Sequence, residues 1–150
     1  MPKFTVFIPA FDIEGLQKTL RTARIAPDIL VIHNGDANVE HLCMRYRARC
    51  KTQIPGVTLG AYAMDAFHNW LLLLLPGEEL STETMNFLSE WRRRRKDECA
   101  GYLIRDADGH PQLRFINRAK FNWIGEFPPV PTDAGMFPGS IVSADLRRAA

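Results

Sequence analysis

The stretch that decides the fold is "NWLLLLLPGEEL", which runs from Asn69 to Leu80. Five consecutive leucines, 71–75, are followed by Pro76 and Gly77, which end an extended segment, and then by two glutamates. A short apolar run bounded by turn residues is typical of a buried strand, and it is far below the roughly 20 residues that a membrane helix needs. The sequence therefore predicts a core strand that delivers the following turn to the edge of a sheet.

Two earlier segments have the same character. "FTVFIPA" (4–10) and "DILVIHNG" (28–35) are apolar runs rich in β-branched and aromatic residues, and both close on turn-forming residues. Between them, apolar residues recur at helical spacing over 16–23, with Asp12 as the predicted N-cap. These segments predict two buried parallel strands joined by an amphipathic helix.

The alternation of strand and helix continues along the chain. "ANVEHLCMRYRARC" (37–50) predicts a second helix opened by Asp36 or Asn38, and "GVTLGA" (56–61) predicts a third strand before the leucine strand. Parallel strands with right-handed helical crossovers predict a mostly parallel sheet with helices on both faces, a three-layer α/β/α, Rossmann-like arrangement.

After Leu80 the pattern changes. The segment 81–98 predicts a helix with Trp91 on its buried stripe and the cations of 92–96 near its C-terminal end, where the helix dipole favours them. No second basic cluster or interleaved aromatics accompany these cations, so we interpret them as a solvated helix end and expect no nucleic-acid partner. Next, "GYLIRDADGHPQLRFIN" (101–117) predicts an antiparallel hairpin with its turn at 106–109.

The totals favour one domain with a loop-rich end. A chain of 150 residues with 46% hydrophobic content can bury one sizeable core, and its net charge of +2 identifies no class of partner. From Pro128 onward the chain is rich in proline and glycine and predicts an irregular covering loop. We expect a nucleotide-binding-like half (1–80), a helix and hairpin (81–127), and a loop and tail (128–150).

The cysteines and the N-terminus favour a cytoplasmic protein. Cys43, Cys50 and Cys99 form no C-x-x-C pair and have no matching histidine spacing, so they indicate neither a zinc site nor a disulfide framework. The opening "MPKFTVFIPAF" has no long apolar core and no small-residue cleavage site, so it does not resemble a signal peptide.

Four segments together resemble the family 2 glycosyltransferases, whose nucleotide-binding domain has the GT-A fold. They are "FTVFIPAFDIEGLQKTL", "DILVIHNGDAN", "NWLLLLLPGEELSTE" and "QLRFINRAKFNWIGEF", which follow one another at fitting distances over most of 3–127. The resemblance implies a GT-A-like fold that binds a nucleotide-sugar or a saccharide. It also implies nucleotide-binding residues at the turns after the first two strands, namely Pro9, Ala10, Phe11, Asp12, Asn34 and Asp36.

The departures from the family pattern are chemically important. Where the family has an Asp-Asp-Gly-Ser turn, this chain has His33-Asn34-Gly35-Asp36, so paired carboxylates are lost. Where the family has an Asp-x-Asp that holds a divalent metal, this chain has Leu75, Pro76 and Gly77. Leucine and glycine side chains supply no hard oxygen ligands, so we expect no metal and no cofactor.

Three groups of carboxylates remain near this pattern. Glu78 and Glu79 are donor-site candidates, although Glu79 also suits the first turn of the following helix. Asp106 and Asp108 match Asp-x-Asp literally, but they lie in a predicted hairpin turn where aspartates serve the backbone. Glu126 lies where the resemblance implies an acceptor-side general base, and an exposed strand-end glutamate is the alternative.

These features leave three hypotheses. The favoured one is a degenerate, glycosyltransferase-like protein, a pseudoenzyme with a nucleotide-binding, sugar-binding or interaction role and a reduced acceptor half. The second is an active transferase with an atypical, metal-independent donor site around Asp12, Asn34 and Glu78. The third is an α/β interaction module without a ligand, because a fold alone does not define a function.

Overall fold

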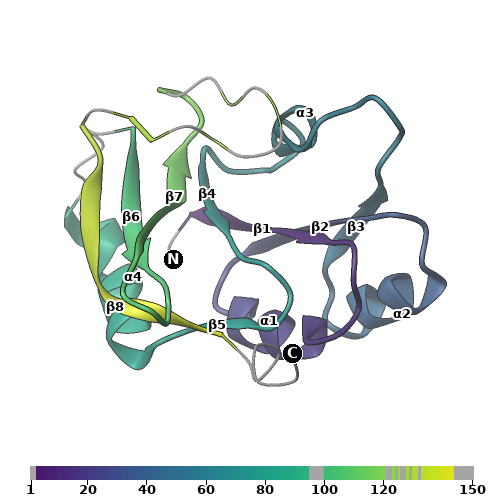
Figure 1. Cartoon of the computed structure of the whole chain (residues 1–150), viewed down its shortest axis with the longest axis horizontal. Coiled ribbons are helices and arrows are strands. Elements are labelled where there is room, and N and C mark those ends of the chain that lie inside the picture. Colours follow the sequence, from purple (N-terminus) through teal and green to yellow (C-terminus); the bar gives the residue numbers. More distant parts are fainter. Residues whose placement is uncertain are drawn as a thin grey trace.

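The computed structural model describes residues 3–94, 100–120, 123, 125, 128, 130–131 and 133–143. Its first half alternates strands with helices (Figure 1). In chain order these are β1 (Phe4–Ala10), α1 (Leu16–Ala23), β2 (Asp28–His33), α2 (Ala37–Arg45), β3 (Arg49–Thr52), α3 (Leu59–Ala63) and β4 (Trp70–Leu73). The second half contains β5 (Glu78–Leu80), α4 (Thr82–Arg94), β6 (Gly101–Arg105), β7 (Pro111–Asn117) and β8 (Gly135–Ser143).

The described strands form one curled, mixed sheet in the order β3-β2-β1-β4-β7-β6-β8-β5. The first four are parallel, and the predicted pairing of 28–33 with 4–9 is confirmed, with Thr5 opposite Asp28 and Ala10 opposite His33. Every residue of β1, β2 and β4 is buried, because both faces of these strands are covered. The leucine strand therefore lies in the interior of the sheet, as predicted.

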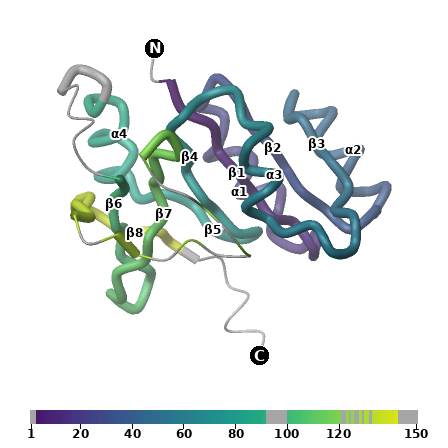
Figure 2. Tube along the Cα trace, turned by 90° about the horizontal axis from the view of Figure 1, so that it is seen from above, coloured from purple at the N-terminus to yellow at the C-terminus, as the bar shows by residue number. Residues whose placement is uncertain are grey.

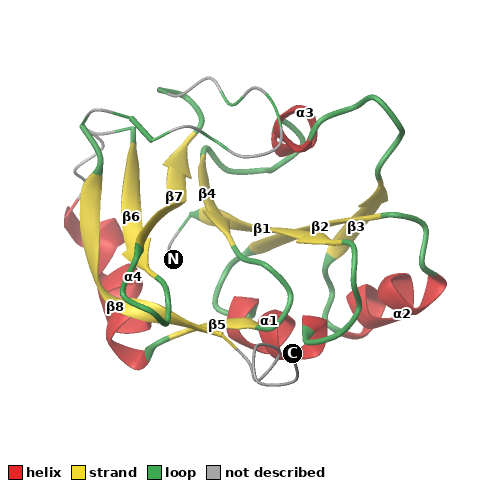
Figure 3. Ribbon diagram, in the orientation of Figure 1, coloured by secondary structure: helices red, strands yellow, loops and turns green. Residues whose placement is uncertain are grey.

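Helices cover the two faces of the sheet unequally (Figure 3). One face packs against α1, α2 and α4 in a core that includes Val6, Leu20 and Trp91. The opposite face packs against α3, the one described helix on that side, and against Trp123, whose ring lies edge-on to Phe7 with centroids 5.3 Å apart. Seen from above, α3 lies over the region of β1 and β2 (Figure 2).

The helix boundaries depend on their caps. The Asp36 carboxylate accepts a hydrogen bond from the Asn38 N–H at 2.8 Å, which confirms one of the two predicted caps of α2. The predicted cap of α1 is wrong, because Asp12 instead accepts from the Glu14 N–H at 3.0 Å and α1 starts after Gly15. Gly15 has a φ of +79°, a conformation that glycine adopts without steric cost.

The predicted third strand is also wrong. The strand at this place is β3, which ends before the predicted segment begins, and residues 59–63 form α3. β3 has the sequence "RCKT" and is a half-exposed edge strand, so it carries no apolar run that would reveal it. Gly56, with a φ of +87°, turns the chain within the segment that was expected to be extended.

The antiparallel half follows the predicted hairpin. β7 pairs antiparallel with both β4 and β6, and the turn between β6 and β7 is closed by a hydrogen bond from the Gly109 N–H to the Asp106 carbonyl at 3.0 Å. Trp91 is buried as predicted and packs against Trp70 and Phe115. The side chains of 92–96 lie outside the described part of the structure.

The expected covering loop after Pro128 contains a strand. β8 pairs parallel with β6 and antiparallel with β5, and its Phe137 and Ile141 are buried. Proline and glycine suggested a loop because Pro138 and Gly139 interrupt the strand, and the β6–β8 register shifts in this region. Nothing in 144–150, where a last helical turn was expected, is described.

Candidate functional site

The strongest candidate site is a pocket at the carboxyl ends of the first three strands. Because β1, β2 and β3 are parallel, the turns that follow them meet at one edge of the sheet, where ligands of α/β proteins generally bind. The pocket has a volume of about 480 Å³. We call it the strand-end pocket, and it is lined by Phe11, Asn34, Gln53, Ile54, Pro55, Gly56, Val57 and Thr58.

The far wall of the strand-end pocket is a tied loop. The Gln53 N–H donates to the His33 carbonyl at 2.7 Å, and the Gln53 side chain donates to the Val57 carbonyl at 2.7 Å. The Ile54 N–H donates to the Tyr62 hydroxyl at 2.7 Å, which ties the loop to α3. These bonds hold the loop in place against β2 and α3.

The lining combines apolar contact area with few polar side chains. Phe11 is 44% exposed and Ile54 is 63% exposed, which is unusual for large apolar residues beside a cavity. Asn34 provides an amide that can both donate and accept hydrogen bonds. A flat ring with polar edges fits such a surface better than a charged group does.

The structure places the predicted nucleotide-binding residues in three ways. Phe11 and Asn34 line the strand-end pocket, while Pro9 and Ala10 are buried within β1. Asp12 and Asp36 lie in the adjacent turns, and one oxygen of each carboxylate accepts a backbone N–H from the residue two positions on. The structure thus brings the turn residues together, with neutral side chains facing the pocket and carboxylates serving the turns.

His33 is part of the framework. It is 1% exposed, its Nδ1 accepts a hydrogen bond from the Gly35 N–H at 3.0 Å, and its Nε2 lies 3.9 Å from a Glu40 oxygen. A buried imidazole with partners on both nitrogens positions the turn that carries Asn34.

The end of the leucine strand is occupied by a buried ion pair. The Arg114 guanidinium donates to both oxygens of Glu78, at 2.6 and 2.9 Å, and to the Leu73 carbonyl at 3.1 Å. Glu78 also accepts the Leu75 N–H at 2.7 Å. Both carboxylate oxygens are therefore engaged within the protein, and Glu79 lies in β5, not in a helix.

The turn after the leucine strand folds onto α1. The Gly77 N–H donates to the Gly15 carbonyl at 3.1 Å and to the Thr19 hydroxyl oxygen at 2.9 Å, and Thr19 donates to the Glu78 carbonyl at 2.8 Å. Both Gly77 and Thr19 are buried. The segment that a metal-dependent site would present to a ligand is thus packed against the helix layer.

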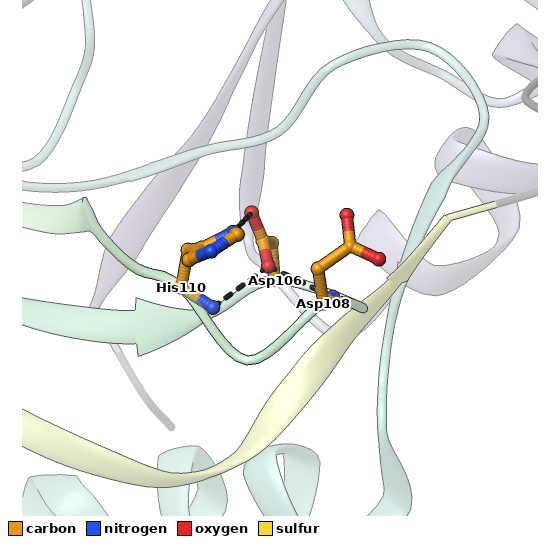
Figure 4. Close-up of side chains that lie close together, drawn as sticks. All are labelled: Asp106, Asp108 and His110. Atoms are coloured by element: carbon orange, nitrogen blue, oxygen red, sulfur yellow. Dashed lines mark hydrogen bonds and ion pairs between the residues drawn. The ribbon is translucent and has the colours of Figure 1, made fainter.

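The literal Asp-x-Asp lies in the hairpin turn (Figure 4). Ligand atoms of Asp106, Asp108 and His110 lie within 4.8 Å of one another. One Asp106 oxygen accepts the N–H groups of both Asp108 and His110 at 2.9 Å, and the other accepts from Gln112 at 2.9 Å. The hydrogen bond from the His110 N–H, together with those from Asp108 and Gln112, holds the pKa of Asp106 below its ordinary value against its partial burial. This carboxylate closes the turn, as the sequence predicted.

Two further candidates need separate statements. Glu126, the predicted general base, lies outside the described residues. Cys43 and Cys50 are free thiols, and burial, followed by the neighbouring Cys50, raises the pKa of the Cys43 thiol to about 12. A thiol with that pKa is protonated at neutral pH and is a poor nucleophile.

Sequence reasoning missed two parts of this region. The loop 53–58 was expected to lead into a strand, yet it forms most of the strand-end pocket. The Pro55-Gly56 pair was the signal that could have indicated a turn there. Arg114 was noted only as part of a motif, and no local pattern identifies Glu78 as its partner.

Comparison of the sequence with models of protein families and with curated protein sequences finds no match. Comparison with solved structures finds Staphylococcus aureus TarS. The 1–349 fragment in complex with UDP-GlcNAc has a TM-score of 0.54 at 13% identity, covering 72% of this chain and 36% of that chain. The same fragment in a second crystal structure also has a TM-score of 0.54, and TarS in a third has 0.53 at 10% identity over 22% of that chain.

The likeness shows a glycosyltransferase-like fold. This chain spans about a third of the length of the TarS fragment that it matches. No helix among the described residues is long and apolar enough to cross a membrane.

Proposed function

We propose that this chain is a degenerate glycosyltransferase-like protein that binds a nucleotide-sugar through its nucleoside, without a divalent metal and without sugar transfer. The observation that carries the proposal is the strand-end pocket, where Phe11 and Asn34 follow adjacent parallel strands. A nucleobase offers a flat face for Phe11 and Ile54 and polar edges for Asn34. UDP-GlcNAc, which is bound in one TarS structure, is the natural first probe.

The absence of metal dependence is argued from the leucine strand. The Glu78 carboxylate is paired with Arg114, and the residues that precede it supply no side-chain oxygen. A divalent cation that bridges a diphosphate requires several hard oxygen ligands. The diphosphate therefore contributes little to affinity, and the nucleoside contributes most of it.

Calorimetric titration tests this proposal. We expect UDP-GlcNAc, UDP and uridine to bind with similar, weak affinity, and we expect millimolar Mn²⁺ to change the affinity by less than tenfold, which is about 1.4 kcal/mol. Phe11→Ala and Asn34→Ala should each weaken binding. Phe67→Ala removes another exposed phenylalanine, 69% exposed and outside the pocket lining, and should leave binding unchanged.

Other outcomes identify the alternatives. A Mn²⁺-dependent gain of tenfold or more would overturn the metal-free site and direct attention to Asp106 and Asp108, where a double alanine variant would locate the metal. Release of UDP from UDP-GlcNAc in the presence of saccharide acceptors would instead support an active transferase. No heat with any nucleotide would favour the ligand-free interaction module.

A further inference from the structure

A second pocket lies on the sheet face that α3 covers, and its volume is about 380 Å³. We call it the α3 pocket, and its walls include Gly60, Ala63 and Met64 of α3 and its C-terminal end, Arg118 and Lys120 of the turn after β7, and Trp123. It is distinct from the strand-end pocket, whose nearest lining residue in the chain, Thr58, precedes α3.

The α3 pocket is cationic. Arg118 and Lys120 line it, and no described lining residue is acidic. The nearest acidic residue along α3 and the loop that follows is Asp65, and its carboxylate is paired with Lys51 at 2.9 Å. The local charge is therefore positive and favours an anion.

The Arg118 guanidinium is held in position at the wall. Its Nη1 donates to the Ala63 carbonyl at 2.8 Å, and its backbone N–H donates to the Asn69 carbonyl at 2.9 Å. The other guanidinium N–H groups have no partner among the described residues. A fixed guanidinium with donors to spare loses less side-chain entropy when it binds an oxyanion.

Trp123 adds another unused donor. The residue is 7% exposed, and its indole Nε1–H is buried without an acceptor among the described residues. A Cβ at Gly60 would approach the indole Cδ1 to 2.9 Å, so glycine allows the ring to lie flush against α3. A buried donor without an acceptor is costly, and a ligand rich in acceptors would relieve that cost.

We propose that the α3 pocket binds an organic phosphate, with Arg118 and Lys120 as its cationic ligands and the Trp123 wall beside the organic part. A phosphate monoester offers three acceptor oxygens and close to two negative charges, which match a pocket of donors without acceptors. The pocket volume falls within the range of small-molecule sites, so it accommodates more than the phosphate group alone. This inference does not depend on the proposed nucleotide site.

NMR titration with the three tryptophan indole N–H signals as reporters tests the proposal. Glucose 1-phosphate should shift the Trp123 indole signal and leave those of Trp70 and Trp91, which pack against each other in the core, unchanged. Inorganic phosphate should bind about tenfold more weakly, and glucose should not bind. Glucuronate shows whether a carboxylate can replace the phosphate.

Matched variants separate this site from nonspecific charge effects. Lys120→Gln should weaken glucose 1-phosphate binding about tenfold, which is about 1.4 kcal/mol, whereas Lys18→Gln removes an exposed lysine on α1 and should have no effect. Arg118→Lys keeps the charge, loses the fork geometry and should also weaken binding. Glucose binding as strongly as its phosphate, an unshifted Trp123 signal, or equal effects of the two lysine variants would overturn the proposal.

Discussion

At the scale of single residues, the chemistry at the end of the leucine strand is set by the ion pair of Glu78 and Arg114. The two residues are buried, 36 positions apart in the chain, and joined by two short hydrogen bonds. A buried pair of this kind contributes little net stability compared with apolar residues, but breaking it leaves an uncompensated charge. The pair therefore explains why Glu78 serves the fold at a position where the sequence suggested a ligand contact.

Glu78→Gln should lower the free energy of unfolding by about 3 to 5 kcal/mol, because it leaves the Arg114 charge buried without its counterion. Urea denaturation measures this loss, with Glu79→Gln, the neighbouring half-exposed residue, as the control. The double variant Glu78→Leu, Arg114→Met should be more stable than Glu78→Gln. A double variant that is the least stable of the set would show that the pair itself contributes most of the stability.

A second residue-scale prediction concerns Asp28. Its carboxylate accepts hydrogen bonds from the Thr5 hydroxyl at 2.6 Å, from Arg49 at 2.8 and 2.9 Å, and from the Phe67 N–H at 3.0 Å. Burial by itself would raise the pKa of Asp28, but the hydrogen bonds from Arg49, Thr5 and Phe67 outweigh it and hold the pKa below the ordinary value of 3.8.

A lowered folded pKa means that this stabilisation is fully present above pH 3.8 and is lost as the pH falls through the folded pKa. Asp28→Asn should therefore be less stable than the natural chain at neutral pH, and the difference should shrink in acid. Unfolding free energies measured from pH 7 downwards check this, with the exposed Asp65→Asn as the comparison. A difference that stays constant in acid would assign the effect to packing.

At the scale of elements, the turn after β4 and the start of α1 fit together through two glycines. Gly15 combines a φ of +79° with a backbone so close to Gly77 that an added Cβ would lie 2.6 Å from the Gly77 Cα. Gly109 has a similar φ of +85° and nothing within 4 Å of an added Cβ. The two glycines therefore differ in close approach and share the same backbone requirement.

Gly15→Ala should destabilise the protein clearly more than Gly109→Ala. Both substitutions bear the cost of a left-handed conformation, about 1 kcal/mol, and only Gly15→Ala also forces the β4–β5 turn away from α1. Thermal unfolding of both variants measures the difference. Equal losses would mean that the turn adjusts without cost, and the tight packing of 75–77 on α1 would lose its support.

At the scale of the whole molecule, β8 joins parts that are distant in sequence. It lies between β6 and β5, and its Phe137 packs against Phe87 of α4, Tyr102 of β6 and Phe115 of β7, with centroids 4.8 to 5.2 Å apart. The last described strand thus closes the core on the side of the antiparallel half.

Phe137→Ala should cost about 3 to 5 kcal/mol, because it opens a cavity where four elements meet. Met136→Ala, at the neighbouring and 42% exposed position, should cost less than about 1 kcal/mol. Chemical denaturation of the two variants gives both values. A small loss for Phe137→Ala would indicate that β8 contributes little to the core.

The sequence alone determined the elements whose signal is local. The buried strands at 4–10, 28–33 and 70–73 show as apolar runs, and the turn at 106–109 shows in its aspartates and glycine. It also indicated the glycosyltransferase-like fold and the position of Phe11 and Asn34 at the edge of the sheet. These features depend on neighbours within a few positions, so periodicity and turn chemistry reveal them.

Tertiary structure decided the rest. β3 and β8 are strands because neighbouring strands offer them hydrogen-bond partners, although "RCKT" and "GMFPGSIVS" lack a clear strand pattern. The pairing of Glu78 with Arg114 and the closure of the strand-end pocket by the loop 53–58 join residues from separate elements. Such contacts depend on which surfaces meet when the chain folds, and no local pattern of residues carries that information.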